Sequence, residues 1–417
     1  MNSSTGKLGD DYAMTEQKEA CRAALRTLRT GDATKMTAWL RRHLFDHVLP
    51  FWERYAMDEC GGIATCIADD GTIQSGDKWM WSQWRAVWVF SRVYRTLDPD
   101  PRWLRHALHI AEFATRHAWD GTHWALLVNR EGKVLRGHES IYVHAFAVYG
   151  LVELFKASGN EEHLRLARQT ADSALKVLAL PYEQIPHFPY PIPAGGKPQG
   201  LPMVWSFTLA ELGEVTGDER YLRAARAMSA EIFEQFYRRD LDVGLEFVAQ
   251  DGSLLAGPEG RVVVPGHVIE NMWFQIHVSQ ILDTSAPRVP QACALVLRHL
   301  ELGWDRVHQG LLLAVDPQGG LSDGWKFPDT KLWWPHTESL YATLLAWKET
   351  GDGRFFDWYE RLWAFCLDNY VEWSHGEWRQ KLNRDLSVLT GTVVLPVKDP
   401  FHLPRSLILQ IELLSKA

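Results

Sequence analysis

The sequence has few cysteines and no excess of basic residues. Its 417 residues include 5 cysteines, an odd number with no Cys-x-x-Cys pair. This pattern disfavours a disulfide framework and gives no zinc signature. Lys and Arg number 44 against 52 Asp and Glu, for a net charge of -8, whereas nucleic-acid binders usually carry a basic excess. We therefore expect no nucleic-acid partner and no bound metal.

Long apolar runs and the common cofactor motifs are also absent. The first residues, MNSSTGKLGDDYAMTEQKEA, are polar, and no stretch approaches the ~18 apolar residues of a membrane span. We expect a cytoplasmic protein without a membrane partner, with a flexible tail over residues 1–15 and one domain over residues 16–417. No P-loop, GxGxxG, HExxH or GxSxG motif is present, so we expect no cofactor, and no motif supports activation by a nucleotide.

Tryptophan, in contrast, is abundant. The chain contains 20 Trp but only 12 Tyr. The indole ring offers a broad apolar face and one N–H donor, which suits both large cores and stacking on sugar rings. The composition thus favours a carbohydrate ligand.

A weak internal repeat organises the chain. Three segments begin with Ser-Gly-Asn or Thr-Gly-Asp, at residues 158–160, 216–218 and 350–352, and residues 98–100 form a looser copy. The glycine is suited to end one helix, and the Asn or Asp to cap the next. An amphipathic pattern follows each copy and predicts a helix.

A short alternating segment that ends in a turn follows each amphipathic helix. Five copies are recognisable, and the loop 186–200, PHFPYPIPAGGKPQG, occupies the place of a divergent sixth. Such segments predict short strands that enter tight turns. Their positions are residues 61–71, 121–132, 244–252, 310–320 and 376–385.

Between the copies lie helical stretches that are apolar nearly all round, a pattern typical of buried helices. They span residues 82–97, 140–158, 203–216 and 337–350. Six alternations of a buried and an amphipathic helix predict an all-α fold, an (α/α)6 barrel of six helical hairpins with short β-hairpin segments at one mouth. An open helical solenoid is the alternative.

Two clusters of chemically active residues lie at predicted helix starts. In the segment 265–273, His267, Glu270 and Trp273 recur at steps of three, which places them on one helical face. The dipole at a helix N-terminus disfavours the cationic form of His267, which leaves the imidazole neutral and able to act as a base. The segment 331–338 contains Trp334, His336 and Glu338. Either cluster can also be ordinary buried packing.

Two further positions stand out. His402 lies beside Arg405 at the start of another predicted helix, a pattern that is weak when taken alone. Arg85 lies within the apolar stretch 82–97, where an unpaired guanidinium is costly. We expect Arg85 either to face a polar cavity or to pair with a carboxylate, with Glu270 and Glu338 as candidates.

Taken together, these motifs resemble the N-acylglucosamine 2-epimerase superfamily, closest to the acylaminosugar 2-epimerase branch. The resemblance runs from about residue 61 to residue 405, and PGHVIE, WWPHTE and PFHLPR in this order are its most specific marks. It implies an (α/α)6 barrel, in agreement with the repeat, and an isomerase that inverts C2 of an aldose without a cofactor.

The resemblance also implies roles for the candidate residues. His267 and His402 would be the catalytic pair: one removes the C2 proton of the open sugar to give an enediolate, and the other returns a proton to the opposite face. Arg85 would stabilise the developing charge, Glu270 and Glu338 would orient the histidines or assist ring opening, and Trp273, Trp334 and His336 would contribute to the substrate site.

The sequence departs from the family pattern at a few places. Family members often have a glycine where Trp84 precedes Arg85, so Trp84 either narrows the pocket or packs outward. The stretch MVWSFTLAEL has no histidine, and this favours N-acetylglucosamine and N-acetylmannosamine as substrates over those of the cellobiose epimerases and ketose isomerases.

Three alternatives remain open: a mannose-type aldose–ketose isomerase, a glycoside hydrolase with two catalytic carboxylates, and a sugar-binding protein without activity. The expected partner is a monosaccharide, and a homodimer is possible.

Overall fold

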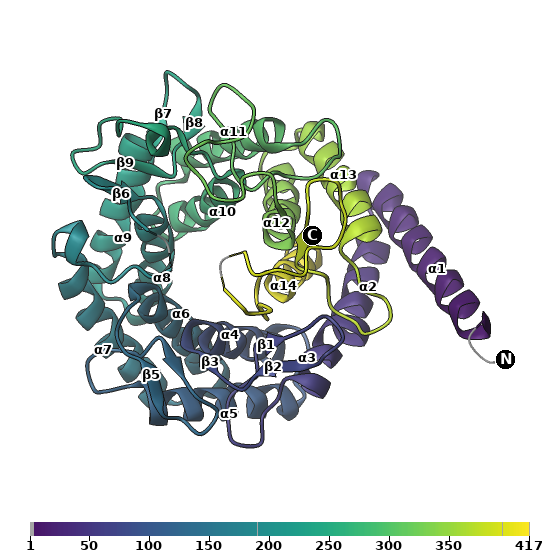
Figure 1. The fold of residues 1–417 in the computed structure, drawn as a ribbon, viewed down its shortest axis with the longest axis horizontal. Coiled ribbons are helices and arrows are strands. Elements are labelled where there is room, and N and C mark those ends of the chain that lie inside the picture. The colour runs from purple at the N-terminus through teal and green to yellow at the C-terminus, as the bar shows by residue number, and fades with distance from the viewer. Residues whose placement is uncertain (1–3, 190, 394, 417) are drawn as a thin grey trace.

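The chain folds as an (α/α)6 barrel (Figure 1). The computed structural model describes residues 4–189, 191–393 and 395–416. Within this part of the chain, an inner ring is formed by α4 (Met80–Thr96), α6 (Ile141–Ser158), α8 (Gly200–Thr216), α10 (Pro265–Ile281), α12 (Trp333–Thr350) and α14 (His402–Ser415). Consecutive inner helices pack against each other, and α14 packs against α4 and thereby closes the ring.

Outer helices cover this ring. They are α2 (Thr34–Arg42), α3 (Leu49–Tyr55), α5 (Pro101–Ala118), α7 (Glu161–Leu178), α9 (Glu219–Glu231), α11 (Ser285–Gly303) and α13 (Gly353–Asn369). The amphipathic pattern explains the division, because the outer helices bury one face and the inner helices are buried nearly all round. The last hairpin is completed across the termini, since α14 packs against α2.

The first helix, α1 (Ser4–Arg29), lies along α2 and α13 at the edge of the ring (Figure 1). Arg29 pairs with Asp357 and Glu360 of α13, each at 2.6 Å. The flexible tail expected over residues 1–15 stays a prediction; α1 begins within it, at Ser4. Residues 1–3 lie outside the described residues.

The predicted caps are confirmed. The carboxylates of Asp218 and Asp352 accept hydrogen bonds from backbone N–H groups two residues later, each at 2.9 Å. Gly217 and Gly351 end the preceding helices in the left-handed conformation, with φ of 65° and 69°, which glycine adopts without strain. One boundary differs: α12 begins at Trp333 rather than at residue 337, so Trp334 and His336 lie inside the helix.

The short strands lead into the starts of the inner helices. β3 (Lys78–Trp79), β6 (Gly196–Pro198) and β10 (Lys331–Leu332) immediately precede or lie next to α4, α8 and α12. The divergent segment 186–200 thus contributes a strand, β6, which pairs with β9. The other strands are β1 (Cys66–Ile67), β2 (Ile73–Ser75), β4 (Leu127–Val128), β5 (Val134–Arg136), β7 (Tyr237–Arg238), β8 (Val243–Gly244), β9 (Phe247–Ala249) and β11 (Lys381–Leu382).

A search of the described residues for a helix that is both long and apolar enough to cross a membrane finds none.

Candidate active site

A deep cavity lies inside the ring, at the end where the inner helices begin. Each inner helix contributes to its wall, and so do the loops before α8 and α14. The chemically active side chains in the lining are Arg85, Glu246, His267, Glu270, Lys381, Asp399, His402 and Arg405. Aromatic rings complete the wall, among them Trp81, Tyr142, Phe146, Tyr149 and Trp334.

His267 lies in the first turn of α10, as its position in the sequence predicts. Its Nδ1 is 3.0 Å from Oε2 of Glu246, a buried residue next to β8. Burial alone would lower the pKa of His267, but the charge and hydrogen bond of Glu246 outweigh it and raise the pKa above its ordinary value. The imidazole is therefore able to carry a proton in the cavity, and the neutral form expected from the helix dipole alone is corrected by the charge of Glu246.

His402 begins α14 and points to the same cavity. Its Nδ1 is 2.7 Å from Oε1 of Glu338. Glu338 also accepts hydrogen bonds from Arg405, at 2.7 Å, and from the indole N–H of Trp273, at 2.9 Å. Although burial would raise the pKa of Glu338, the charges of Arg405 and His402 hold it well below its usual range. The carboxylate thus remains charged beside the imidazole.

Trp334 contacts both histidines. Its ring stacks on His267, with centroids 4.9 Å apart and planes at 29°. The centroid of His402 lies 5.7 Å away from the same ring. The two imidazoles line one cavity from different helices, and both lie against the ring of Trp334, which lines the same cavity.

Arg405 connects the two predicted carboxylates. Its guanidinium donates to Oε1 of both Glu270 and Glu338 and is almost fully buried. Glu270, Glu338 and His402 place donor atoms within 4.8 Å of one another, a set that is able to hold a metal ion. Arg405 already neutralises its carboxylates, however, so a divalent cation would compete with a buried positive charge.

Arg85 lines the cavity, but its partner differs from the prediction. The guanidinium pairs with Asp399 and lies 4.0 Å from the ring centroid of Phe146. Glu270 and Glu338 are held by Arg405 instead. Trp84 packs outward against Trp124, with centroids 4.9 Å apart, and does not narrow the cavity.

Trp273, Glu338 and His336 lie behind the lining. Trp273 and Glu338 are 1% exposed and act on the site through their hydrogen bonds. His336 lies deeper in the wall: its Nδ1 donates to the carbonyl of Leu332, at 2.7 Å, and its Nε2 accepts the N–H of Leu311, at 2.8 Å. Burial lowers the pKa of His336 to about 3, so this imidazole is neutral and committed to the fold.

Three functional groups of the cavity are not among the predicted site residues: Glu246, Asp399 and Arg405. Asp399 and Arg405 lie within three residues of His402 in the sequence, and this proximity to a predicted catalytic residue could have indicated a role for them in the site. Glu246 follows β8, 21 positions before His267, and only the packing of this hairpin against α10 brings the two together.

Most of the chain is similar to known sugar epimerases. A family model described as N-acylglucosamine 2-epimerase (GlcNAc 2-epimerase) matches residues 61–404. The chain is 28% identical to the N-acylglucosamine 2-epimerase of Bos taurus, over 91% of this chain and 92% of that protein. It is 24% identical to the cellobiose 2-epimerase of Ruminococcus albus, over 88% and 96% of the two chains.

A solved structure has the same fold. The cellobiose 2-epimerase from Bacillus thermoamylovorans B4167 superposes with a TM-score of 0.79 at 20% identity, over 91% of this chain and 99% of that one. This likeness supports the ring of helical hairpins described above.

Proposed function

The chain belongs to the N-acylglucosamine 2-epimerase family, and on this premise we propose that it inverts C2 of an aldose by proton transfer between His267 and His402. Its curated relatives are named as sugar epimerases. Epimerases are isomerases. The observation that carries the proposal is the position of the two imidazoles: both line one cavity, from α10 and α14, and both lie against the ring of Trp334.

Each carboxylate partner suits its histidine to proton transfer. Glu246 and Glu338 accept from Nδ1, which favours the tautomer with the proton on that atom and a lone pair on Nε2. Nε2 of one histidine is then the base, and Nε2 of the other, when protonated, is the acid. Inversion needs one base and one acid, because a proton must leave one face of C2 and another must arrive on the opposite face.

The reaction proceeds on the ring-opened sugar. The base takes the proton from C2, the C2–H electron pair forms the C1–C2 double bond, and the carbonyl pair moves to the oxygen on C1. Arg85 lines the cavity and is the proposed donor to this oxygen anion. The second histidine delivers its proton to the opposite face of C2, and the C1 carbonyl is restored. The groups here need no external oxidant or reductant.

The proposed substrates are N-acetylglucosamine and N-acetylmannosamine. The support is the higher identity to the N-acylglucosamine 2-epimerase of Bos taurus, at 28%, than to the cellobiose 2-epimerase of Ruminococcus albus, at 24%. The absence of a histidine from residues 203–212 agrees with this choice.

Incubation with each sugar in deuterated water, followed by NMR, tests the proposal. The expected result is deuterium at C2 and appearance of the other N-acetyl epimer from either side. Fructose formed from mannose, without epimerisation of the N-acetyl sugars, would assign the chain to aldose–ketose isomerisation. Absence of C2 exchange from every aldose would contradict the two-base chemistry.

The glycoside hydrolase alternative fits the geometry less well. It needs one carboxylic acid with a raised pKa beside a second carboxylate. Glu270 and Glu338 instead share the guanidinium of Arg405, and the pKa of Glu338 is lowered.

A further inference from the structure

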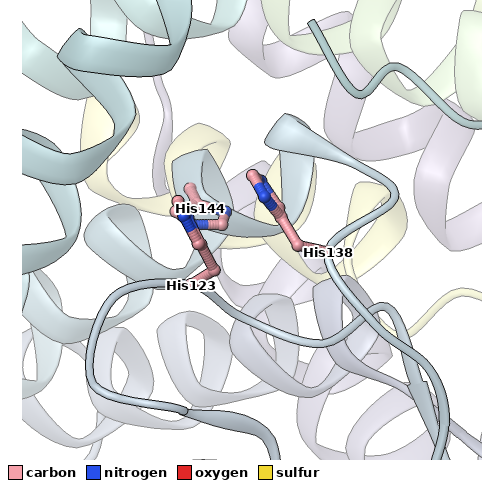
Figure 2. A group of neighbouring side chains, drawn as sticks. All are labelled: His123, His138 and His144. Atoms are coloured by element: carbon pink, nitrogen blue, oxygen red, sulfur yellow. The ribbon is translucent and has the colours of Figure 1, made fainter.

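Three histidines converge at a place that the proposed reaction does not use. His123 lies in the loop between α5 and β4, His138 in the loop between β5 and α6, and His144 in the first turns of α6 (Figure 2). The rings of His123 and His138 are stacked, with centroids 4.1 Å apart. The centroid of His144 lies 4.6 Å from that of His138. Each residue offers a ring nitrogen, and these atoms all lie within 4.8 Å of one another.

The cluster is separate from the cavity. Tyr142, Phe146 and Tyr149 line the cavity from α6. Since each residue of an α-helix advances by about 100°, His144 points roughly 200° away from Tyr142, to the outer side of α6. There it meets α7, where Ser173 lies 3.5 Å from Nδ1 of His123. A surface hollow lined by Thr122, His123 and Ser173 opens on this side.

Three ring nitrogens of the cluster form no complete hydrogen bond with the described part of the protein, whereas Nδ1 of His123 lies 3.5 Å from the hydroxyl of Ser173. Among the described residues, neither ring nitrogen of the fully buried His144 forms a hydrogen bond, and neither does Nε2 of His138. The carbonyls of Thr122 and Ser140 favour the protonated ring of His144 without completing such a bond. A buried polar atom without a partner is costly, so a ligand that accepts these lone pairs would stabilise the arrangement.

The charge state suits a metal ion. Burial, with the neighbouring His123, lowers the pKa of His138 to about 4, and burial also lowers that of His144. Both rings are therefore neutral at pH 7, and neutral imidazole is the form that binds metals. Asp120 is near enough for its charge to act on His138, and it supplies negative charge beside the group.

We propose that His123, His138 and His144 form a binding site for Zn²⁺ or a similar divalent ion of the late first transition row. Zinc–nitrogen bonds of about 2.0–2.1 Å in a tetrahedral site place the nitrogens roughly 3.3 Å apart. The ring nitrogens lie within 4.8 Å of one another. Rotation of the two half-buried loop side chains, His123 and His138, brings the nitrogens to the distance that zinc requires. Water takes the fourth position, and the ion ties both loops to α6.

Co²⁺ titration of the purified full-length protein, stripped with a chelator, tests the site, because Co²⁺ in a tetrahedral nitrogen site gives intense visible bands. The expected result is one saturating equivalent per chain, displaced by Zn²⁺, and a higher melting temperature with Zn²⁺. His123→Ala and His138→Ala should each weaken binding on the order of 100-fold. His308→Ala, in a loop elsewhere, should leave it unchanged.

A cysteine variant gives a positive readout at the same place. His138→Cys should retain Co²⁺ and add a thiolate-to-metal charge-transfer band, which a metal bound elsewhere would not show. Circular dichroism establishes that each variant is folded. No saturable binding by the wild-type protein would overturn the proposal. Binding that survives both alanine variants but is lost in Glu338→Gln would also overturn it, because the ion would then occupy the cavity.

Discussion

At the scale of single residues, the notable arrangement is a carboxylate behind each proposed catalytic imidazole. Glu246 holds His267, and Glu338 holds His402. The two carboxylates differ in their own partners. Glu338 is fixed by Arg405 and Trp273, whereas Glu246 accepts from the side-chain amide of Gln199, at 3.1 Å. The two histidines therefore have unequal electrostatic surroundings, although each serves as acid in one direction and as base in the other.

Replacing either histidine should abolish epimerisation. His267→Asn and His402→Asn keep some hydrogen bonding but remove the proton-transfer group, whose loss costs about 10²–10⁴-fold in rate. Chromatography of the two N-acetyl epimers measures this loss, and circular dichroism checks the fold. Near-normal epimerisation in both variants would contradict the two-histidine mechanism.

The same variants should differ in isotope exchange. Starting from one epimer, the variant that retains the base on the C2–H side should still introduce deuterium at C2 without inversion. The other variant should do neither, and the roles should exchange when the opposite epimer is supplied. Equal exchange by both variants from both epimers would place a different base in the cavity.

The pH dependence should respond to Glu246. Glu246→Gln preserves an acceptor for His267 but removes the negative charge that raises its pKa, so the pKa of His267 should fall. In the direction where His267 is the base, the acidic limb of kcat/KM should move to lower pH. In the reverse direction, where His267 is the acid, the basic limb should move to lower pH. Glu183→Gln, on the exposed surface, is the control, and unchanged limbs in the Glu246 variant would count against this role of the pair.

At the scale of helices and strands, the site depends on where the inner helices begin. Local sequence predicted the buried helices, the caps and the positions of His267 and His402, because these depend on periodicity and on residues adjacent in the chain. It did not predict which carboxylate pairs with which cation. Arg405 reaches Glu270 across 135 positions, and Asp399 reaches Arg85 across 314, so these choices are made only when the ring closes.

The close approach of α6 to α4 should make Gly150 intolerant of a side chain. A Cβ at Gly150 would lie 2.6 Å from the carbonyl oxygen of Trp84, so Gly150→Ala would force the helices apart. Overpacking of this kind costs typically 1–3 kcal/mol, against a gain in helix propensity of about 1 kcal/mol. Urea unfolding should show a net loss of stability. Gly353→Ala is the matched control, since a Cβ there has no neighbour within 4 Å, and equal effects of the two changes would refute the packing argument.

At the scale of the whole molecule, buried neutral histidines join neighbouring parts of the ring. His299 repeats the pattern of His336: its Nδ1 donates to the carbonyl of Leu295, at 2.7 Å, and its Nε2 accepts the N–H of Gly244, at 3.1 Å. His299 thus links the outer helix α11 to the segment that contains Gly244, and His336 links the inner helix α12 to the segment that contains Leu311. Protonation of Nε2 would turn it into a donor that faces the backbone N–H it now accepts. The folded state therefore requires both rings to be neutral.

This arrangement predicts that acid weakens the fold well before the carboxylates titrate. Burial lowers the pKa of His299 to about 4 and that of His336 to about 3, below the ~6.5 of an unfolded chain. Their contribution is therefore complete above pH ~6.5 and declines as the pH falls, by about 1.4 kcal/mol per pH unit for each histidine.

Urea unfolding at pH 7, 6 and 5 should show this loss. His299→Gln, which cannot titrate, should reduce the slope by about 1.4 kcal/mol per pH unit, and His299→Gln with His336→Gln should reduce it by about twice that amount. Parallel pH profiles for the wild-type and variant proteins would mean that these rings accept protons in the folded state, which contradicts their assigned hydrogen bonds.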